Sequence, residues 1–194
     1  MGKFYLMRHG ETDMNIIRCM QGRTKTKLND TGRAQAAKAG KNLEEKGIRP
    51  TVVYCSPLDR ARETAEIATG WKTGQIQFDD RLMEMAFGKH EGTRTADMPE
   101  EYKAVFFDDP KSFVPKDGEE SYTQLRQRTT SFLKEVFEKY KDSEDTILIV
   151  THGAVIHDML TFLRKLDLNL FWKEVHPLNC QVFPITDMLE QAEF

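Results

Sequence analysis

Long apolar runs, a large excess of charge of either sign, and clusters of cysteine are all missing from this 194-residue chain. Because no apolar run is long enough to span a bilayer, we expect no contact with a membrane. A formal net charge of only −3 gives no sign of binding to nucleic acid. The three cysteines (Cys19, Cys55 and Cys180) are far apart and odd in number, so we expect reduced thiols in a cytoplasmic protein.

The chain also lacks a compact group of His, Asp and Glu residues with metal-ligand spacing, so we expect neither a metal ion nor another cofactor. The first apolar run follows Met1-Gly2-Lys3 directly, which leaves no room for a signal peptide. There are no internal repeats, and the length suits one domain over residues 1–194. The composition is compatible with a monomer or a homodimer.

Strand and helix signals alternate along the chain. Short apolar runs predict strands at residues 4–7, 51–55, 76–78, 147–150 and 181–185. Helical spacing predicts helices from Asn29 to Gly47, after Ser56-Pro57, over residues 122–140 and from Ala154 to Arg164, with Ser56 as an N-cap and Pro57 in the first helical position. This alternation predicts a three-layer α/β/α sandwich with a largely parallel central sheet.

Residues 85–120 break the alternation. The segment is rich in aromatic and acidic residues, contains prolines, and has one short helical pattern near residues 100–107. We expect a cap-like excursion from the sheet. Ser121 and Gln124 then form a capping box, which predicts that the next helix begins there.

Two His-Gly dipeptides carry most of the functional information. Residues 4–7 lead into Arg8-His9-Gly10, and residues 147–150 lead into Thr151-His152-Gly153. Open α/β sheets bind ligands beyond the carboxyl ends of their strands. Two imidazoles and an arginine delivered there suggest a reactive centre that handles an anion. A buried imidazole that is held by one nitrogen can attack phosphorus with the other.

Arg60 is a candidate partner for the same anion. It lies in the first turns of the helix after Ser56-Pro57, and a helix amino end favours anions. The alternative is a surface arginine that is balanced by Asp59 or Glu63.

Phosphoryl transfer requires that the nonbridging oxygens be neutralised. Arg8, Arg60 and a protonated His152 can do this without a metal ion. The Asn15 amide and the Gly153 backbone N–H can add hydrogen bonds.

The leaving alkoxide needs a proton, and Glu84 is the candidate donor. It follows the predicted strand at 76–78. The alternatives are a surface glutamate that is paired with Arg81, or a donor role for the nearby Asp80 or Glu91.

Taken in order, these residues resemble the histidine phosphatase superfamily, also called phosphoglycerate mutase-like proteins. The resemblance covers nearly the whole chain. Its motifs are Leu6-Met7-Arg8-His9-Gly10-Glu11-Thr12 with Asn15, Gln21-Gly22, Ser56-Pro57-Leu58 with Arg60, Leu82-Met83-Glu84, and Val150-Thr151-His152-Gly153.

The resemblance implies a role for each residue of the site. His9 is the phosphorylated nucleophile, and Glu84 is the proton donor. Arg8, Arg60 and His152 form the phosphate pocket. Asn15, Gln21, Gly22 and Gly153 are further substrate-contacting positions.

Some positions depart from the family's pattern, and these changes bear on the substrate more than on the chemistry. His90 stands where a tryptophan is frequent, and Glu119-Glu120-Ser121 stands for the usual Gly-Glu-Ser. His90 could face the pocket mouth. For His157 and His176 we expect structural roles.

The function predicted from the sequence is a metal-independent phosphomonoesterase that acts on a small phosphorylated metabolite through a covalent phosphohistidine. The alternative is a cofactor-dependent phosphoglycerate mutase. Such a mutase carries an adjacent arginine pair after the proton donor, whereas this chain has an isolated Arg94 there. A non-catalytic phospho-ligand binding module ranks third, because both candidate catalytic residues are present.

Overall fold

The computed structural model describes residues 1–194 and contains one five-stranded sheet. The strands are β1 (Lys3–Arg8), β2 (Val52–Cys55), β3 (Gln77–Phe78), β4 (Thr146–Thr151) and β5 (Val182–Pro184). They lie in the order β3-β2-β4-β1-β5, and every pair is parallel except β1 and β5. The prediction of a largely parallel sheet is confirmed.

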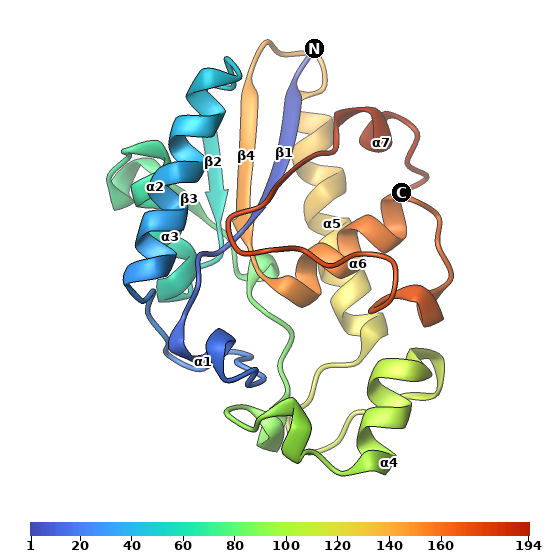
Figure 1. Cartoon of the computed structure of the whole chain (residues 1–194). Helices are drawn as coiled ribbons and strands as arrows, with labels where there is room; N and C mark the ends of the chain where they lie inside the picture. The colour runs from blue at the N-terminus through green and yellow to red at the C-terminus, as the bar shows by residue number, and fades with distance from the viewer.

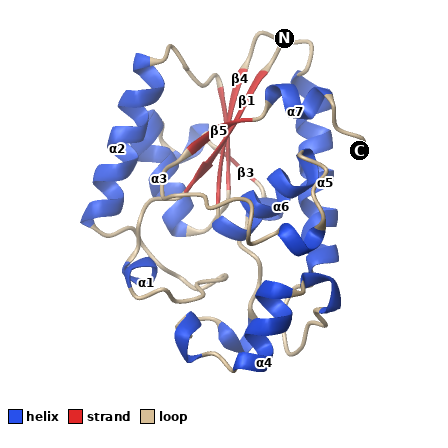
Figure 2. Ribbon diagram, turned by 45° about the vertical axis from the view of Figure 1, so that its right-hand side comes forward, coloured by secondary structure: helices blue, strands red, loops and turns tan.

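Helices cover both faces of this sheet (Figures 1 and 2). One face carries α2 (Asp30–Glu45) and α3 (Asp59–Thr69). The other carries α5 (Tyr122–Tyr140), α6 (Gly153–Leu163) and the short α7 (Thr186–Glu190). Two further short helices, α1 (Asp13–Ile16) and α4 (Glu100–Lys103), lie outside these layers. The three-layer α/β/α prediction is therefore confirmed.

The two helical layers are packed with residues of different size. Helices α2 and α3 meet the sheet and each other through small side chains, and a Cβ on Gly40 would lie only 2.3 Å from the Ala68 carbonyl oxygen. On the opposite face the core contains large apolar residues, among them Phe4, Phe132 and Leu133. Burial of apolar area on both faces fixes the strands, and hence the positions of their carboxyl ends.

Residues 85–120 leave the sheet, as the sequence predicts, and α4 continues into a π turn at Ala104–Asp108. Three 3₁₀ turns flank this helix rather than a further strand. Phe106 is fully buried at the centre of an aromatic cluster, with its ring 5.6 Å from both the Tyr122 ring and the Trp172 ring. Much of the aromatic content of the segment is therefore core that attaches it to α5 and to the loop after α6.

The capping predictions give mixed results. Asn29 caps α2, and Ser121 and Gln124 form the expected capping box of α5. The prediction for Ser56 and Pro57 is wrong, because α3 begins at Asp59 without a side-chain cap. The Ser56 hydroxyl instead lies 2.7 Å from His152 Nε2, a partner that only the tertiary fold brings near. No helix has the length and apolar character that a membrane span needs.

Candidate active site

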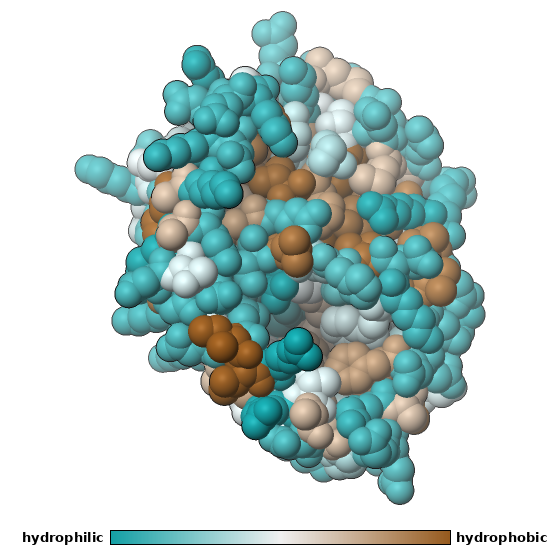
Figure 3. Space-filling view, viewed as in Figure 1, coloured by the Kyte–Doolittle hydropathy of each residue, from teal (hydrophilic) through white to brown (hydrophobic).

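A cavity of about 620 Å³ opens beyond the carboxyl ends of β1 and β4. The space-filling view shows this face hollowed near its centre (Figure 3). Six of the predicted site residues line the cavity: Arg8, His9, Asn15, Gln21, Glu84 and Gly153. The adjacent parallel strands β1 and β4 therefore bring both His-Gly dipeptides to one place, as the sequence predicts.

Arg60 and His152 lie behind the cavity wall, and both are completely buried. Arg60 is thus not a surface arginine, and its proposed counter-ions Asp59 and Glu63 pair with other arginines. Gly22 does not line the cavity either. Its carbonyl oxygen accepts a hydrogen bond from Arg60 Nη2 at 2.7 Å, so it positions Arg60 rather than facing the cavity.

The His9 ring is held in one orientation by its own loop. Its Nδ1 lies 2.7 Å from the Gly10 carbonyl oxygen, which can only accept, so Nδ1 carries the proton. Burial, reinforced by Arg60 and Arg8, lowers the pKa of His9 well below its usual value and keeps the ring neutral. Nε2 has no partner in the chain and keeps an unshared electron pair for attack.

His152 lies beside His9, with the ring centroids 5.2 Å apart. Its Nε2 bonds the Ser56 hydroxyl, and its Nδ1 is buried without a partner. The expectation of a protonated His152 is corrected, because burial and Arg60 lower its pKa well below the usual value. A neutral ring that accepts the Ser56 hydroxyl proton at Nε2 still carries a proton on Nδ1. That N–H is available to an anion.

Two guanidinium groups complete the cationic wall. Arg8 donates from Nη1 to the Pro177 carbonyl oxygen at 2.7 Å, and Arg60 donates to backbone oxygens of residues 22 and 24. Burial lowers the pKa of Arg60 to about 10, so it remains charged at neutral pH. The Nε atoms of both arginines are buried and unpartnered. Buried donors without acceptors are rare in folded proteins, and here they fit an anion.

Asn15 and Gln21 point their amide nitrogens into the same space. The Asn15 side-chain oxygen accepts from the Thr12 backbone N–H at 3.0 Å, and the Gln21 oxygen accepts from the Thr12 and Thr26 hydroxyls. Because a backbone N–H can only donate, it fixes the orientation of the Asn15 amide, and the two hydroxyls hold the Gln21 amide in place. Both NH₂ groups are left for a ligand.

Glu84 is the one carboxyl group that lines the cavity. Its two oxygens accept from the Met85 and Ala154 backbone N–H groups at 2.9 and 3.3 Å. Burial raises the pKa of Glu84, against the opposing effect of Arg60 and these hydrogen bonds. The surface-pair alternative is wrong, because Arg81 pairs with Asp79 and Glu135. Asp80 is exposed, and neither it nor Glu91 lines the cavity.

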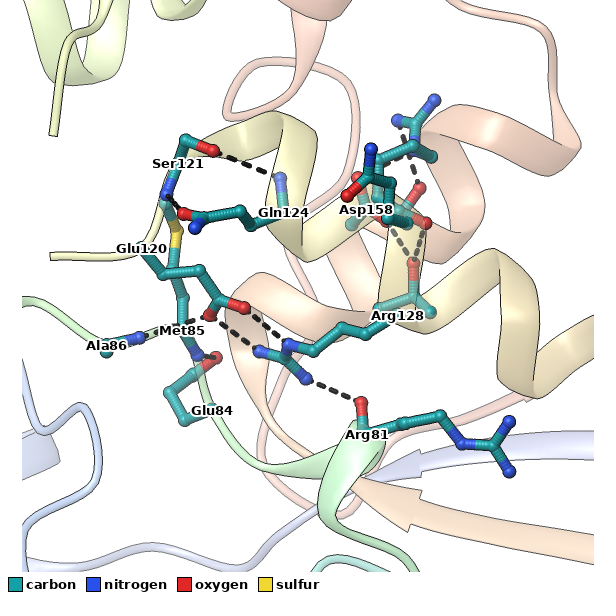
Figure 4. A network of polar contacts seen from close by, with 12 residues as sticks. Arg81, Glu84, Met85, Ala86, Glu120, Ser121, Gln124, Arg128 and Asp158 are labelled. Carbon is teal, nitrogen blue, oxygen red and sulfur yellow. Dashed lines mark hydrogen bonds and ion pairs between the residues drawn. The ribbon is translucent and has the colours of Figure 1, made fainter.

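A polar network fixes the segment that carries Glu84 (Figure 4). The Glu120 carboxylate accepts two hydrogen bonds from Arg128, at 2.6 and 2.9 Å, and one from the Ala86 backbone N–H at 3.3 Å. The Glu120 backbone N–H in turn donates to the Ala86 carbonyl oxygen. Residues that flank the excursion therefore hold Glu84 against the start of α6.

The cavity also contains residues that sequence reasoning missed. Arg18, His157 and His176 line it, although we expected structural roles for the two histidines. Arg18 has a backbone φ of 54°, which no sequence pattern predicts. His90 does not reach this cavity, because its ring stacks on Tyr102 with the centroids 4.0 Å apart.

Comparison with known proteins agrees with this geometry. The family model of the histidine phosphatase superfamily (branch 1) matches residues 4–187. The chain is 30% identical over 187 residues to a putative phosphoserine phosphatase 2 of Hydrogenobacter thermophilus, covering 95% of this chain and 89% of that protein. It is 34% identical over 157 residues to a metal-independent phosphoserine phosphatase of Arabidopsis thaliana, covering 78% of this chain and 64% of that one.

Among solved structures, YhfR of Bacillus stearothermophilus superimposes with a TM-score of 0.84 at 31% identity, covering 94% of this chain and 89% of that chain. A family model that spans almost the whole chain, together with this fold, establishes the relationship. The chain belongs to the histidine phosphatase superfamily, and it is a phosphomonoester hydrolase of that superfamily's branch 1.

Proposed function

We propose that His9 is the nucleophile of a metal-independent phosphomonoesterase and that Glu84 is its proton donor. The His9 Nε2 lone pair attacks phosphorus, the bond from phosphorus to the ester oxygen breaks, and Glu84 protonates that oxygen as it leaves. Water then attacks the phosphohistidine while the Glu84 carboxylate takes its proton. The nitrogen–phosphorus bond breaks, and inorganic phosphate and neutral His9 are regenerated.

The observation that supports this proposal most strongly is the set of unpartnered donors around His9. Arg8 Nε, Arg60 Nε and His152 Nδ1 are all buried without acceptors. Together with the Asn15 and Gln21 amides they can surround the three nonbridging oxygens and stabilise the transition state. The Gly153 N–H, at the first position of α6, has no acceptor within its helix and adds to this set.

We propose a small phosphomonoester as the substrate, with O-phosphoserine as the first compound to assay. The printed names of the Hydrogenobacter and Arabidopsis relatives motivate that choice. Arg18 and His176 line the cavity, are exposed, and suit a substrate carboxylate.

Hydrolysis is favoured over mutase action because three cationic side chains of residues 85–120 form ion pairs away from the cavity. Arg94 and Lys103 pair with acidic residues three positions away along the chain, and Lys111 pairs with Asp167. None of the three lines the cavity. We expect phosphate release from monoesters to exceed the interconversion of 3- and 2-phosphoglycerate greatly, and the reverse ratio would favour the mutase.

We further propose that residues 1–194 act as one domain in which the 85–120 segment caps the cavity. The buried Phe87 lines the cavity and supports that role. A cytoplasmic location is supported by the three unpaired thiols, two of them buried.

The experiment is a phosphate-release screen over phosphomonoesters, with and without EDTA and with vanadate. We expect turnover to survive the chelator, because the protein supplies the positive charge. We expect vanadate to inhibit, because it mimics five-coordinate phosphorus. Loss of activity in EDTA that one metal ion restores would contradict metal independence. If no ester releases phosphate, the proposed phosphatase function is wrong.

A further inference from the structure

His157 occupies a position in the cavity that the proposed chemistry does not use. It lies on α6, one helical turn after Gly153, and residues four apart lie on the same helix face. Gly153 adjoins Arg8 and Glu84, since a Cβ built on it would lie 3.7 Å from Arg8 Nε and from a Glu84 carboxyl oxygen. The axial rise of one turn places His157 roughly 6 Å further along the helix from these groups. It therefore lines the cavity where the leaving part of a substrate lies.

The His157 ring is held in a single tautomer. Its Nδ1 lies 2.7 Å from the Phe171 carbonyl oxygen, which can only accept a hydrogen bond, so Nδ1 carries the proton. Burial lowers the pKa of His157 to about 4, and the positive charges of Arg8 and His176 act in the same direction. At neutral pH the ring is uncharged, and its Nε2 is a hydrogen-bond acceptor.

That acceptor is open to the cavity. The side chain is 6% exposed, Nε2 has no partner in the chain, and it is not among the atoms sealed from solvent. The groups around it are mostly donors, because Arg8, Arg18 and the two amides offer only N–H groups. The proposed reaction uses two further acceptors of the cavity, His9 Nε2 on phosphorus and Glu84 on the ester oxygen. His157 is thus a buried acceptor left for the rest of the substrate.

We propose that His157 is a specificity-determining residue that accepts a hydrogen bond from an O–H or N–H group on the carbon next to the ester carbon. The preferred substrates are then phosphomonoesters with a hydroxyl or ammonium group at that position. This inference rests on the proposed phosphatase function, and it concerns the choice of substrate rather than the chemical step.

The test compares ethyl phosphate with 2-hydroxyethyl phosphate and 2-aminoethyl phosphate, each normalised to p-nitrophenyl phosphate. We expect one or both donor esters to exceed ethyl phosphate in kcat/KM by about 5- to 10-fold, the effect of one hydrogen bond. His157→Asn retains an N–H for Phe171 but loses the cavity acceptor. In this variant the ratio of kcat/KM for the donor esters to that for ethyl phosphate should fall to about one. His157→Gln places an amide oxygen near the former Nε2 and should restore part of the preference.

His90→Asn is the matched control, because His90 is buried outside this cavity and its substitution should leave the preference intact. A wild-type preference of one, or a preference that survives His157→Asn, would overturn the inference. No hydrolysis of any ester, p-nitrophenyl phosphate included, would instead overturn the proposed function.

A second measurement needs no variant. Non-hydrolysable 3-hydroxypropylphosphonate and 3-aminopropylphosphonate can be titrated into protein labelled with ¹⁵N at histidine. At least one of them should shift the His157 Nε2 resonance, whereas propylphosphonate should not. Equal shifts with all three compounds would contradict the role of His157.

Discussion

We call the part of the cavity around His9 the phosphate end and the rest of its lining, from loops and α6, the far end. Arg8 is the last residue of β1, His9 follows it, and His152 follows the adjacent strand β4. At the far end Arg18 and His176 lie in irregular segments and are exposed. His9 and His152 are buried, whereas Arg18 and His176 are exposed.

This difference suggests that the phosphate end carries out the reaction and that the far end determines which substrate binds. The donors that we propose for the phosphoryl group are set by strand register and by internal hydrogen bonds, so they are in place before the substrate arrives. The residues at the far end can change without disturbing the sheet. The comparison predicts large losses for substitutions at the phosphate end and shifts in substrate preference for those at the far end.

Among variants that retain His9, the largest effect is expected for Glu84→Gln, which removes the proton but keeps the shape. Positioned proton transfer contributes roughly 10²- to 10⁴-fold in rate, so kcat on alkyl phosphates should fall by that range. The loss on p-nitrophenyl phosphate should be small, because its leaving group departs without a proton. Glu91→Gln is the control, and equal losses on both substrate types would contradict the donor role of Glu84.

Arg60→Gln should lower kcat by roughly 10²- to 10³-fold, the usual effect of removing one transition-state donor. Arg62→Gln, two positions along α3, removes only partly exposed ion pairs and should change kcat little. Thermal melting of both variants separates lost chemistry from lost folding. A folded Arg60→Gln enzyme with near-normal kcat would show that the buried guanidinium does not act on the phosphate.

Asn15→Ala and Gln21→Ala should each reduce kcat/KM by about tenfold or more, as expected for a hydrogen bond to a charged group. The two losses should be of similar size, because both amides bond the same Thr12. Steady-state kinetics on one alkyl phosphate measures both. If neither variant loses activity, the phosphate end does not extend to these residues.

The last prediction is thermodynamic and concerns His157 at the far end. Its folded pKa of about 4 lies below the unfolded value of about 6.5, so the unfolded state binds the proton more readily between these values. Stability is therefore lost as the pH falls from 6.5 toward 4, by about 2 kcal/mol at pH 5 relative to pH 7. Urea unfolding at both pH values should show a smaller acid loss for His157→Asn than for the wild type. Equal losses would contradict the low pKa.

The sequence predicted the phosphate end well because strand ends are marked locally. An apolar run that meets a polar dipeptide and a glycine locates His9 and His152, and the parallel alternation places them together. The same logic failed at Ser56, where a local capping signal competed with a tertiary partner, His152. Local propensity cannot reveal a contact between residues 96 positions apart.

The far end was not predictable for a related reason. His157 follows a helical pattern of apolar neighbours, so a structural role was the natural interpretation. Its exposure to the cavity depends on the path of the 171–178 loop, which brings the Phe171 carbonyl to one side of the ring. Arg18 adopts a left-handed backbone that is uncommon for residues other than glycine, and only the fold reveals it.

The most direct test of the account is to trap the phosphoenzyme by rapid quenching during turnover and to map the phosphoryl group by mass spectrometry and ³¹P NMR. The account predicts an acid-labile, base-stable phosphohistidine at His9, attached to Nε2 because the Nδ1 proton is bound to the Gly10 carbonyl. The signal should vanish in His9→Ala together with turnover. A phosphoryl group on Nδ1, on His157 or on any other residue, or turnover that persists in His9→Ala, would contradict it.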